Sequence, residues 1–308
     1  MKKKVLVFSI AMLLAFGFSS CNNEEVAQQE NNVEKLAQEE ELVSLQNQIT
    51  DLNASTFGPT VQTRGFGRWF RRVLGIVMSD AVGGMFGSLI GGPVGCIAGA
   101  TAASAGVAGS GAVPTFMTRA GIPEKLPMNQ KALALENVVL DNNVGILNKE
   151  TALYDSIGYY HNKVLIDMNN KGKLTSIKDV RALNREIYIN TCNELGYEVS
   201  LDEAEKVVNH KEIVALVENS SDNFSDYEDM DKYLNDLKKA YPNLSSKLSV
   251  VREFMLGLAN MDINENDGNY AQKVIELINN SNLDENSKKE LRAAIIVGNA
   301  SYQLWTVE

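Results

Sequence analysis

The two histidines and three cysteines are the side chains of this chain best suited to acid–base or nucleophilic chemistry. His161 follows Asp155, Tyr159 and Tyr160 on a predicted helix, where it has the surroundings of a general base. A histidine in such a helix is more often buried and hydrogen-bonded to a neighbour. No H-E-x-x-H, G-x-S-x-G or Walker A pattern is present. We therefore predict no enzyme, with an enzyme of unknown substrate on the helical domain as an alternative.

Acidic and amide side chains gather in residues 262–268, and such groups are calcium ligands. An EF-hand loop counted from Asp262 requires Gly at its sixth position and Glu at its twelfth. Those positions hold Asp267 and Lys273, so we predict an Asx-rich turn instead. Cys192 has no basic partner nearby in the sequence, which favours a structural thiol. We predict neither a metal nor a cofactor.

Cys21 follows the layout of a secretion signal. Residues 2–4 are lysines, residues 5–18 are an apolar run, and Ser19 and Ser20 are small. A cysteine directly after this pattern resembles the lipobox of bacterial lipoproteins. In that family the cysteine becomes the first residue of the mature chain and carries the lipid. The sequence departs from the family pattern at Phe18, where an aliphatic residue is commoner.

The residues around Cys21 resemble those of Bacteroidota lipoproteins, in which looser lipoboxes are typical. Asn22-Asn23-Glu24-Glu25 is similar to the acidic tag that such bacteria use for surface export. The resemblance implies a palmitate-bearing anchor in the cell envelope, at the outer membrane or the cell surface. Ordinary secretion is the alternative, with Cys21 as the last residue removed or the first retained.

Glycine recurs every fourth residue within residues 81–118, a stretch of 38 residues without a charged side chain. The members of this register are Gly83, Gly87, Gly91, Gly95 and Gly99. A row of glycines lets two helix backbones approach closely, which matters where lipid supplies no hydrophobic drive between helices. The register resembles a glycine zipper, and it predicts membrane contact and self-association.

Gly91-Gly92-Pro93 interrupts this segment, because proline lacks an N–H and clashes with the preceding helical turn. We predict a membrane-type hairpin with arms at 75–90 and 94–109, each about 24 Å long at the helical rise. Arms of that length are short for a hydrocarbon core about 30 Å thick. A collapsed Gly/Ala linker is the alternative.

Basic and aromatic side chains are interleaved just before the hairpin. They are Arg64, Phe66, Arg68, Trp69, Phe70, Arg71 and Arg72. Rings at headgroup depth and guanidiniums on phosphates suit a membrane interface, although a solvated basic loop is an alternative. Residues 64–112 together resemble bacteriocin-like peptides in composition, which implies a membrane-disrupting factor as the rival function. The net charge of −10 over 308 residues argues against nucleic acid as a partner.

The segments on either side are acidic and predicted to be helical. Residues 22–56 have eight acids and one base, which predicts a polar, partly helical tether. Leu42, Leu45, Ile49 and Leu52 fit the a and d positions of about two heptads, so a weak self-association helix is the alternative. In residues 119–308 apolar side chains recur at spacings of three and four, which predicts an all-α domain. Residues 271–280 and 285–305 read as a helical hairpin near its end. Stretches 158–162 and 301–305 resemble uncharacterised Bacteroidota lipoproteins with a helical C-terminal domain.

The predicted protein is therefore mainly α and divides into four parts. These are a signal peptide (1–20), the lipidated cysteine and acidic tether (21–56), the Arg/aromatic patch with the glycine segment (57–118), and the helical domain (119–308). The expected partners are membrane lipid, a second copy through the glycine register, and an unidentified protein on the helical domain.

Overall fold

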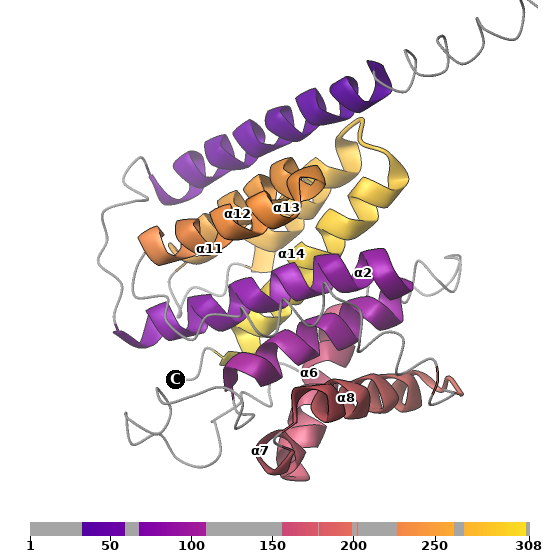
Figure 1. Ribbon diagram of the computed structural model, residues 1–308. Helices are drawn as coiled ribbons and strands as arrows, with labels where there is room; N and C mark the ends of the chain where they lie inside the picture. The colour runs from indigo at the N-terminus through magenta and orange to yellow at the C-terminus, as the bar shows by residue number, and fades with distance from the viewer. Residues whose placement is uncertain are drawn as a thin grey trace, which may run out of the picture.

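The computed structural model describes residues 33–58, 68–108, 156–177, 179–198, 202, 227–261 and 268–305. This part of the chain is mainly helical and contains no strand, which confirms the mainly-α prediction. The α-helices that follow are drawn in Figure 1. They are helix 33–57, α2 (Arg68–Ala108), α6 (Ile157–Asn170), α7 (Lys173–Ser176), α8 (Val180–Leu195), α11 (Tyr227–Ala240), α12 (Ser245–Leu258), α13 (Gly268–Asn280) and α14 (Glu285–Trp305).

Helix α2 is a hairpin at the centre of the fold. Gly91 and Gly92 leave the helical conformation, and Gly92 adopts a φ of 56°, which suits a residue without Cβ. Pro93 then opens the second arm, where a missing N–H costs nothing. The predicted turn at Gly91-Gly92-Pro93 is confirmed. Helices α14, α6, α8 and α12 pack against the hairpin, and α6 and α14 also contact each other (Figure 1).

The first arm of α2 runs antiparallel to α14. Asp80 meets Ser301 by a hydrogen bond, and a Cβ on Gly84 would contact the side chain of Val297. Between these pairs, a Cβ on Gly298 would lie 3.3 Å from the Cβ of Ala81. Small residues on both helices therefore allow α14 to pack closely against the hairpin. The contact between α2 and α14 is the most extensive helix contact in the described part of the fold.

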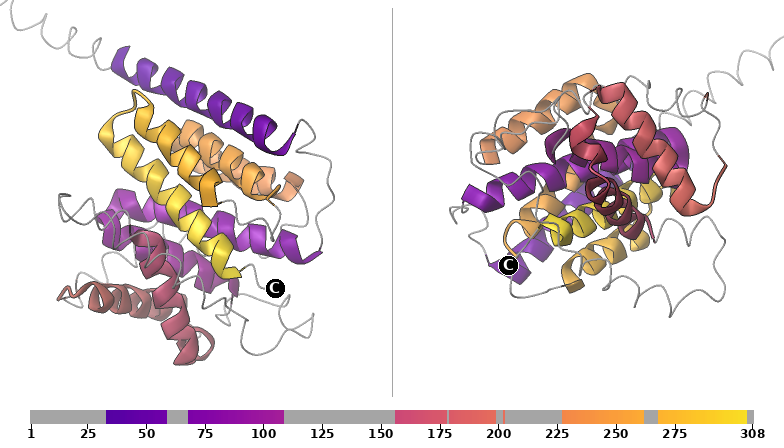
Figure 2. Two further views of the ribbon diagram at one scale, coloured as in Figure 1. Left: turned by 180° about the vertical axis from the view of Figure 1, so that it is seen from behind. Right: turned by 90° about the horizontal axis from the view of Figure 1, so that it is seen from below.

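Helix 33–57 lies across the layer formed by α12, α13 and α14 (Figures 1 and 2). Leu45 and Ile49 have no exposed surface, and Leu42 has 4%. We predicted a tether here, but residues 33–57 are part of the folded bundle. These side chains have heptad-like spacing, and they pack against apolar side chains of the same chain rather than against the helix of a second copy.

The two last helices confirm the predicted helical hairpin. Helix α13 ends at Asn280 and α14 begins at Glu285. Asp284 caps α14, because its carboxylate accepts a hydrogen bond of 2.9 Å from the backbone N–H of Ser287 and one of 2.7 Å from its hydroxyl.

Candidate functional site

The glycine register is the interface between the two arms of α2. A Cβ on Gly87 would lie 2.0 Å from the carbonyl oxygen of Gly95, and one on Gly95 would lie 2.3 Å from the carbonyl oxygen of Gly87. Gly83 and Gly99 face each other in the same way, at 2.7 and 2.5 Å. The arms therefore meet backbone against backbone, with no room for a side chain between them.

Gly91 differs from the other members of the register. It lies in the turn, and a Cβ built there meets nothing within 4 Å. The zipper thus pairs residues four and eight positions on either side of Gly91 within a single chain. In this state the four interface glycines are occupied by the opposite arm, whereas the sequence had led us to expect pairing between copies.

The hairpin is long and apolar enough to cross a membrane, yet the bundle encloses it. The qualifying segment is Val73–Ala105, and 83% of its most apolar window is buried inside the fold. Within residues 73–105 every residue is buried except residues 89–94, which we name the hairpin turn. Leu89 has 46% of its surface exposed there. The hairpin is therefore enclosed along its arms and open at its tip.

Asp80 is the sole charged side chain of the 73–105 segment, and it is fully buried. Its Oδ2 accepts hydrogen bonds of 2.5 Å from the hydroxyls of Ser104, on the second arm, and Ser301, on α14. His161 on α6 places Nε2 3.5 Å from the same oxygen. One carboxylate thus joins both arms of the hairpin to two other helices.

We name Asp80, Ser104, Ser301 and His161 the Asp80 cluster. His161 also contacts its neighbour in the sequence, Asn162. Its Nδ1 lies 3.0 Å from Oδ1 of Asn162, and the Asn162 amide donates to the carbonyl of Ala300 at 3.0 Å. This confirms the interpretation of His161 as a buried, neighbour-bonded histidine. Ser104 and Ser301 both donate their hydroxyl hydrogen bonds to the Asp80 carboxylate, whereas in a Ser–His–Asp relay the serine hydroxyl is hydrogen-bonded to the histidine. All four side chains are buried, so the cluster holds helices together.

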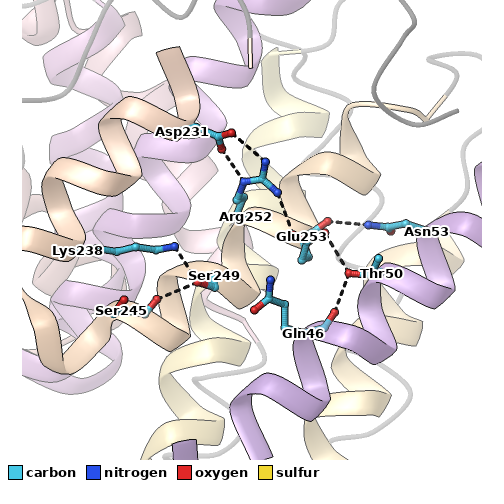
Figure 3. A network of polar contacts seen from close by, with 9 residues as sticks. All are labelled: Gln46, Thr50, Asn53, Asp231, Lys238, Ser245, Ser249, Arg252 and Glu253. Atoms are coloured by element: carbon cyan, nitrogen blue, oxygen red, sulfur yellow. Dashed lines mark hydrogen bonds and ion pairs between the residues drawn. The ribbon is translucent and has the colours of Figure 1, made fainter. Parts of the chain in front are cut away.

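A second polar network joins helix 33–57 to the bundle, and we name it the clasp (Figure 3). Thr50 donates to the Glu253 carboxylate at 3.2 Å, and Asn53 donates to the Glu253 carbonyl at 2.9 Å. Arg252 binds the same carboxylate at 3.0 Å and forms a bidentate pair with Asp231 of α11. The bonds to Asp231 raise the pKa of the Arg252 guanidinium. Helix 33–57 is therefore fixed in orientation against α12.

The predicted membrane-interface residues begin α2. Arg68, Trp69, Phe70, Arg71 and Arg72 form its first residues, at the end of the first arm opposite the hairpin turn. The 23 residues 68–90 span about 35 Å of helix. Cys21 and Arg64 lie outside the described residues, as does the 262–267 part of the predicted Asx turn.

The other candidates from the sequence are placed as follows. Cys192 is buried in α8, as expected for a structural thiol. Among the described residues no group of three or more His, Cys, Asp or Glu side chains gathers to hold a metal ion. The Asp80 cluster was missed from the sequence, although a lone acid in an apolar segment is a recognised signal of a special site.

Comparison with known protein families, curated proteins and solved structures found no match to this chain. The functional assignment therefore depends on three local features. They are the enclosed hairpin with its open turn, the Asp80 cluster that fastens it, and the clasp that fixes helix 33–57.

Proposed function

We propose that this protein is a lipid-anchored component of the cell envelope that contacts a membrane through the hairpin of α2. Its helical domain stores the hairpin and presents an acidic surface to a protein partner. The observation that carries the proposal is the backbone contact of Gly83 and Gly87 with Gly99 and Gly95. Because the arms zip to each other, the hairpin can separate from α14 and α6 without losing its own tightest contacts.

The dimensions of the first arm support insertion with the turn leading. Residues 73–90 span about 27 Å of helix, close to the hydrocarbon thickness of about 30 Å. The turn is uncharged, so it can enter hydrocarbon first. Arginines and aromatic rings at 68–72 would then stop at the near headgroups, the depth that such side chains prefer.

Asp80 supports the idea that the hairpin is stored under control. A carboxylate at the centre of a spanning helix costs about 2.5–3.5 kcal/mol on insertion scales. In the bundle it has three polar neighbours, and only Ser104 would move with the hairpin, leaving Ser301 and His161 behind. The Asp80 cluster therefore favours the stored state over the inserted one.

A membrane-disrupting factor is the second candidate, and the same enclosed hairpin favours it. A chain that only contacts a membrane leaves vesicles sealed, whereas a disrupting chain releases a trapped dye. Leakage from phosphatidylcholine vesicles, measured beside hairpin insertion, separates the two functions. An enzyme on the helical domain gains no support from the described residues, because the one cluster of catalytic residue types that they contain, around Asp80 and His161, is enclosed.

The anchor predicts a specific labelling result. Radiolabelled palmitate should enter the wild-type chain and the Cys192→Ala chain, but not the Cys21→Ala chain, because Cys192 is buried in α8. Label retained in Cys21→Ala would contradict anchoring at that residue. N-terminal sequencing identifies the chains from which the signal has been removed. Cys21→Ala protein that has lost its signal and still co-sediments with envelope membranes would indicate membrane contact by the hairpin. Its complete absence from the membrane fraction would count against any contact besides the lipid.

A further inference from the structure

We infer that one end of the bundle rests on a zwitterionic lipid bilayer. This end, which we name the anchor end, consists of the hairpin turn (89–94) and the amino end of helix 33–57. The inference rests on the proposed function and adds the orientation in which the stored molecule meets the membrane.

Contacts along α14 place the hairpin turn. Asp80 on the first arm contacts Ser301 on α14, whereas Gly84, four residues later on the arm, contacts Val297, four residues earlier on α14. The two helices are therefore antiparallel, and the first arm continues toward the turn as α14 continues back toward its amino end at Glu285. The hairpin turn thus lies toward the amino end of α14.

Helix 33–57 reaches the same end of α14. The backbone N–H of Asp284 donates to the Gln38 side chain at 2.9 Å, and that of Asn282 donates to Glu41 at 2.9 Å. Gln38 and Glu41 belong to the amino-terminal third of helix 33–57. Figures 1 and 2 show the start of this helix and the turn of α2 toward one side of the molecule in both views.

The anchor end is apolar where it is exposed. Val33 and Leu36 have 63% and 64% of their surface exposed, and Leu89 has 46%. Three of the five exposed large apolar side chains of the described residues therefore belong to these two segments. Residues 90–94 are partly exposed and uncharged. An apolar surface of this kind is stabilised by removal from water.

The short chain between Cys21 and helix 33–57 favours the lipid bilayer as the surface that covers the anchor end. Val33 lies twelve positions after Cys21, so a lipid on Cys21 lies within about 42 Å of the anchor end even with the chain extended. The clasp holds helix 33–57 rigidly against α12, so the attachment acts on this end of the bundle rather than on a free tether. The nearest large apolar surface is then the bilayer itself.

Charge selects the kind of bilayer. Acidic side chains outnumber basic ones in the segments that form and border the anchor end. Within residues 33–41 and 282–290 the acids are Glu34, Glu39, Glu40, Glu41, Asp284, Glu285 and Glu290, and the bases are Lys35, Lys288 and Lys289. This balance disfavours anionic headgroups, so contact should persist on phosphatidylcholine and gain nothing from phosphatidylserine. The arginines at 68–72 begin α2 at its other end and do not offset this charge.

Fluorescence quenching of the full mature chain tests the orientation. The lipidated protein is reconstituted in phosphatidylcholine vesicles as Leu89→Cys or Val43→Cys, each labelled with an environment-sensitive maleimide dye. Cys96 and Cys192 are buried and therefore shielded from the dye. Val43 is the matched control: it is 52% exposed on helix 33–57 and about 15 Å along the axis from Val33. Lipid with a nitroxide near the headgroup should quench the dye at 89 several-fold more than the dye at 43.

Each other outcome has a defined meaning. Stronger quenching at 43 than at 89 would show helix 33–57 lying flat on the bilayer and would overturn the inference, as would the absence of quenching at both positions. Quenching at 89 that rises with phosphatidylserine would overturn the zwitterionic assignment. A nitroxide deep in the acyl chains reports insertion separately. Shallow quenching at 89 without deep quenching would support the anchor end while counting against release of the hairpin.

Discussion

Replacing Gly87 with alanine should lower the free energy of unfolding by about 3 kcal/mol or more, the upper end of overpacking effects. The added Cβ would lie 2.0 Å from a backbone carbonyl oxygen of Gly95, so one arm of the hairpin must shift as a whole. The intrinsic helix preference acts in the opposite direction, because alanine is favoured over glycine by about 1 kcal/mol. Urea unfolding of the full chain, followed by circular dichroism, measures the net effect.

Gly91→Ala is the matched control for Gly87→Ala. It belongs to the same four-residue register, but a Cβ there meets nothing within 4 Å, and its φ of −139° lies outside the left-handed region that favours glycine. Its effect should stay within about 0.5 kcal/mol, as for a substitution without a contact. Equal stability of the two variants would show that the two arms do not meet at Gly87, and it would contradict the glycine zipper within the hairpin.

Replacing Ser301 with alanine should lower the free energy of unfolding by about 1.5–3 kcal/mol, the range for a hydrogen bond to a charged group. The substitution removes one of two hydroxyls that donate to the buried carboxylate of Asp80 at 2.5 Å. In an Asp80→Leu background the same substitution should be neutral or stabilising, because the hydroxyl then has lost its acceptor. A double-mutant cycle by urea unfolding measures this coupling.

The cycle has a clear contrary result. Additive effects of Ser301→Ala and Asp80→Leu would mean that the carboxylate does not depend on Ser301, and the Asp80 cluster would then not fasten α14 to the hairpin. Ser55→Ala is the control for a generic loss of a serine, because Ser55 is exposed and bonds only locally to the carbonyl of Leu52. It should change stability by less than about 0.5 kcal/mol.

The turn of the hairpin could be predicted from the sequence because its cause is local. Gly91-Gly92-Pro93 stops a helix by its own chemistry. The pairing of arms was also within reach, since Gly87 and Gly95 are equally spaced about Gly91, as are Gly83 and Gly99. We read the register as a surface for a second copy, because the spacing of small residues alone does not say which backbone approaches them.

The position of helix 33–57 and the Asp80 cluster depend on long-range contacts that spacing does not encode. Leu45 and Ile49 fit a two-stranded coil and a docked helix equally well, and only the partner surface distinguishes them. Asp80 and Ser301 are 221 residues apart in sequence, so no local pattern predicts that they meet. The lipid anchor on Cys21 stays a prediction, because that residue lies outside the described part of the chain.

A reversible lock between the hairpin and α14 isolates the release step. A Cβ on Gly84 would lie 3.5 Å from the Cβ of Val297, which is within the range of a disulfide. The variant is Gly84→Cys with Val297→Cys. Cys96 is replaced by alanine in the same chain, because its sulfur would lie 3.4 Å from the new Cβ and compete for the bond. The oxidised and reduced forms of one protein then serve as test and control.

Labelling of α2 by a photoreactive lipid in phosphatidylcholine vesicles, mapped by mass spectrometry, is the most direct test of the stored hairpin. We expect the two arms, residues 73–88 and 95–105, to be labelled in the reduced protein, protected in the oxidised protein, and labelled again after a reductant is added. The hairpin turn should be labelled in both forms, since it is exposed before release. Equal labelling of the arms in the oxidised and reduced forms, or no labelling in either, would contradict the release of the hairpin from the bundle.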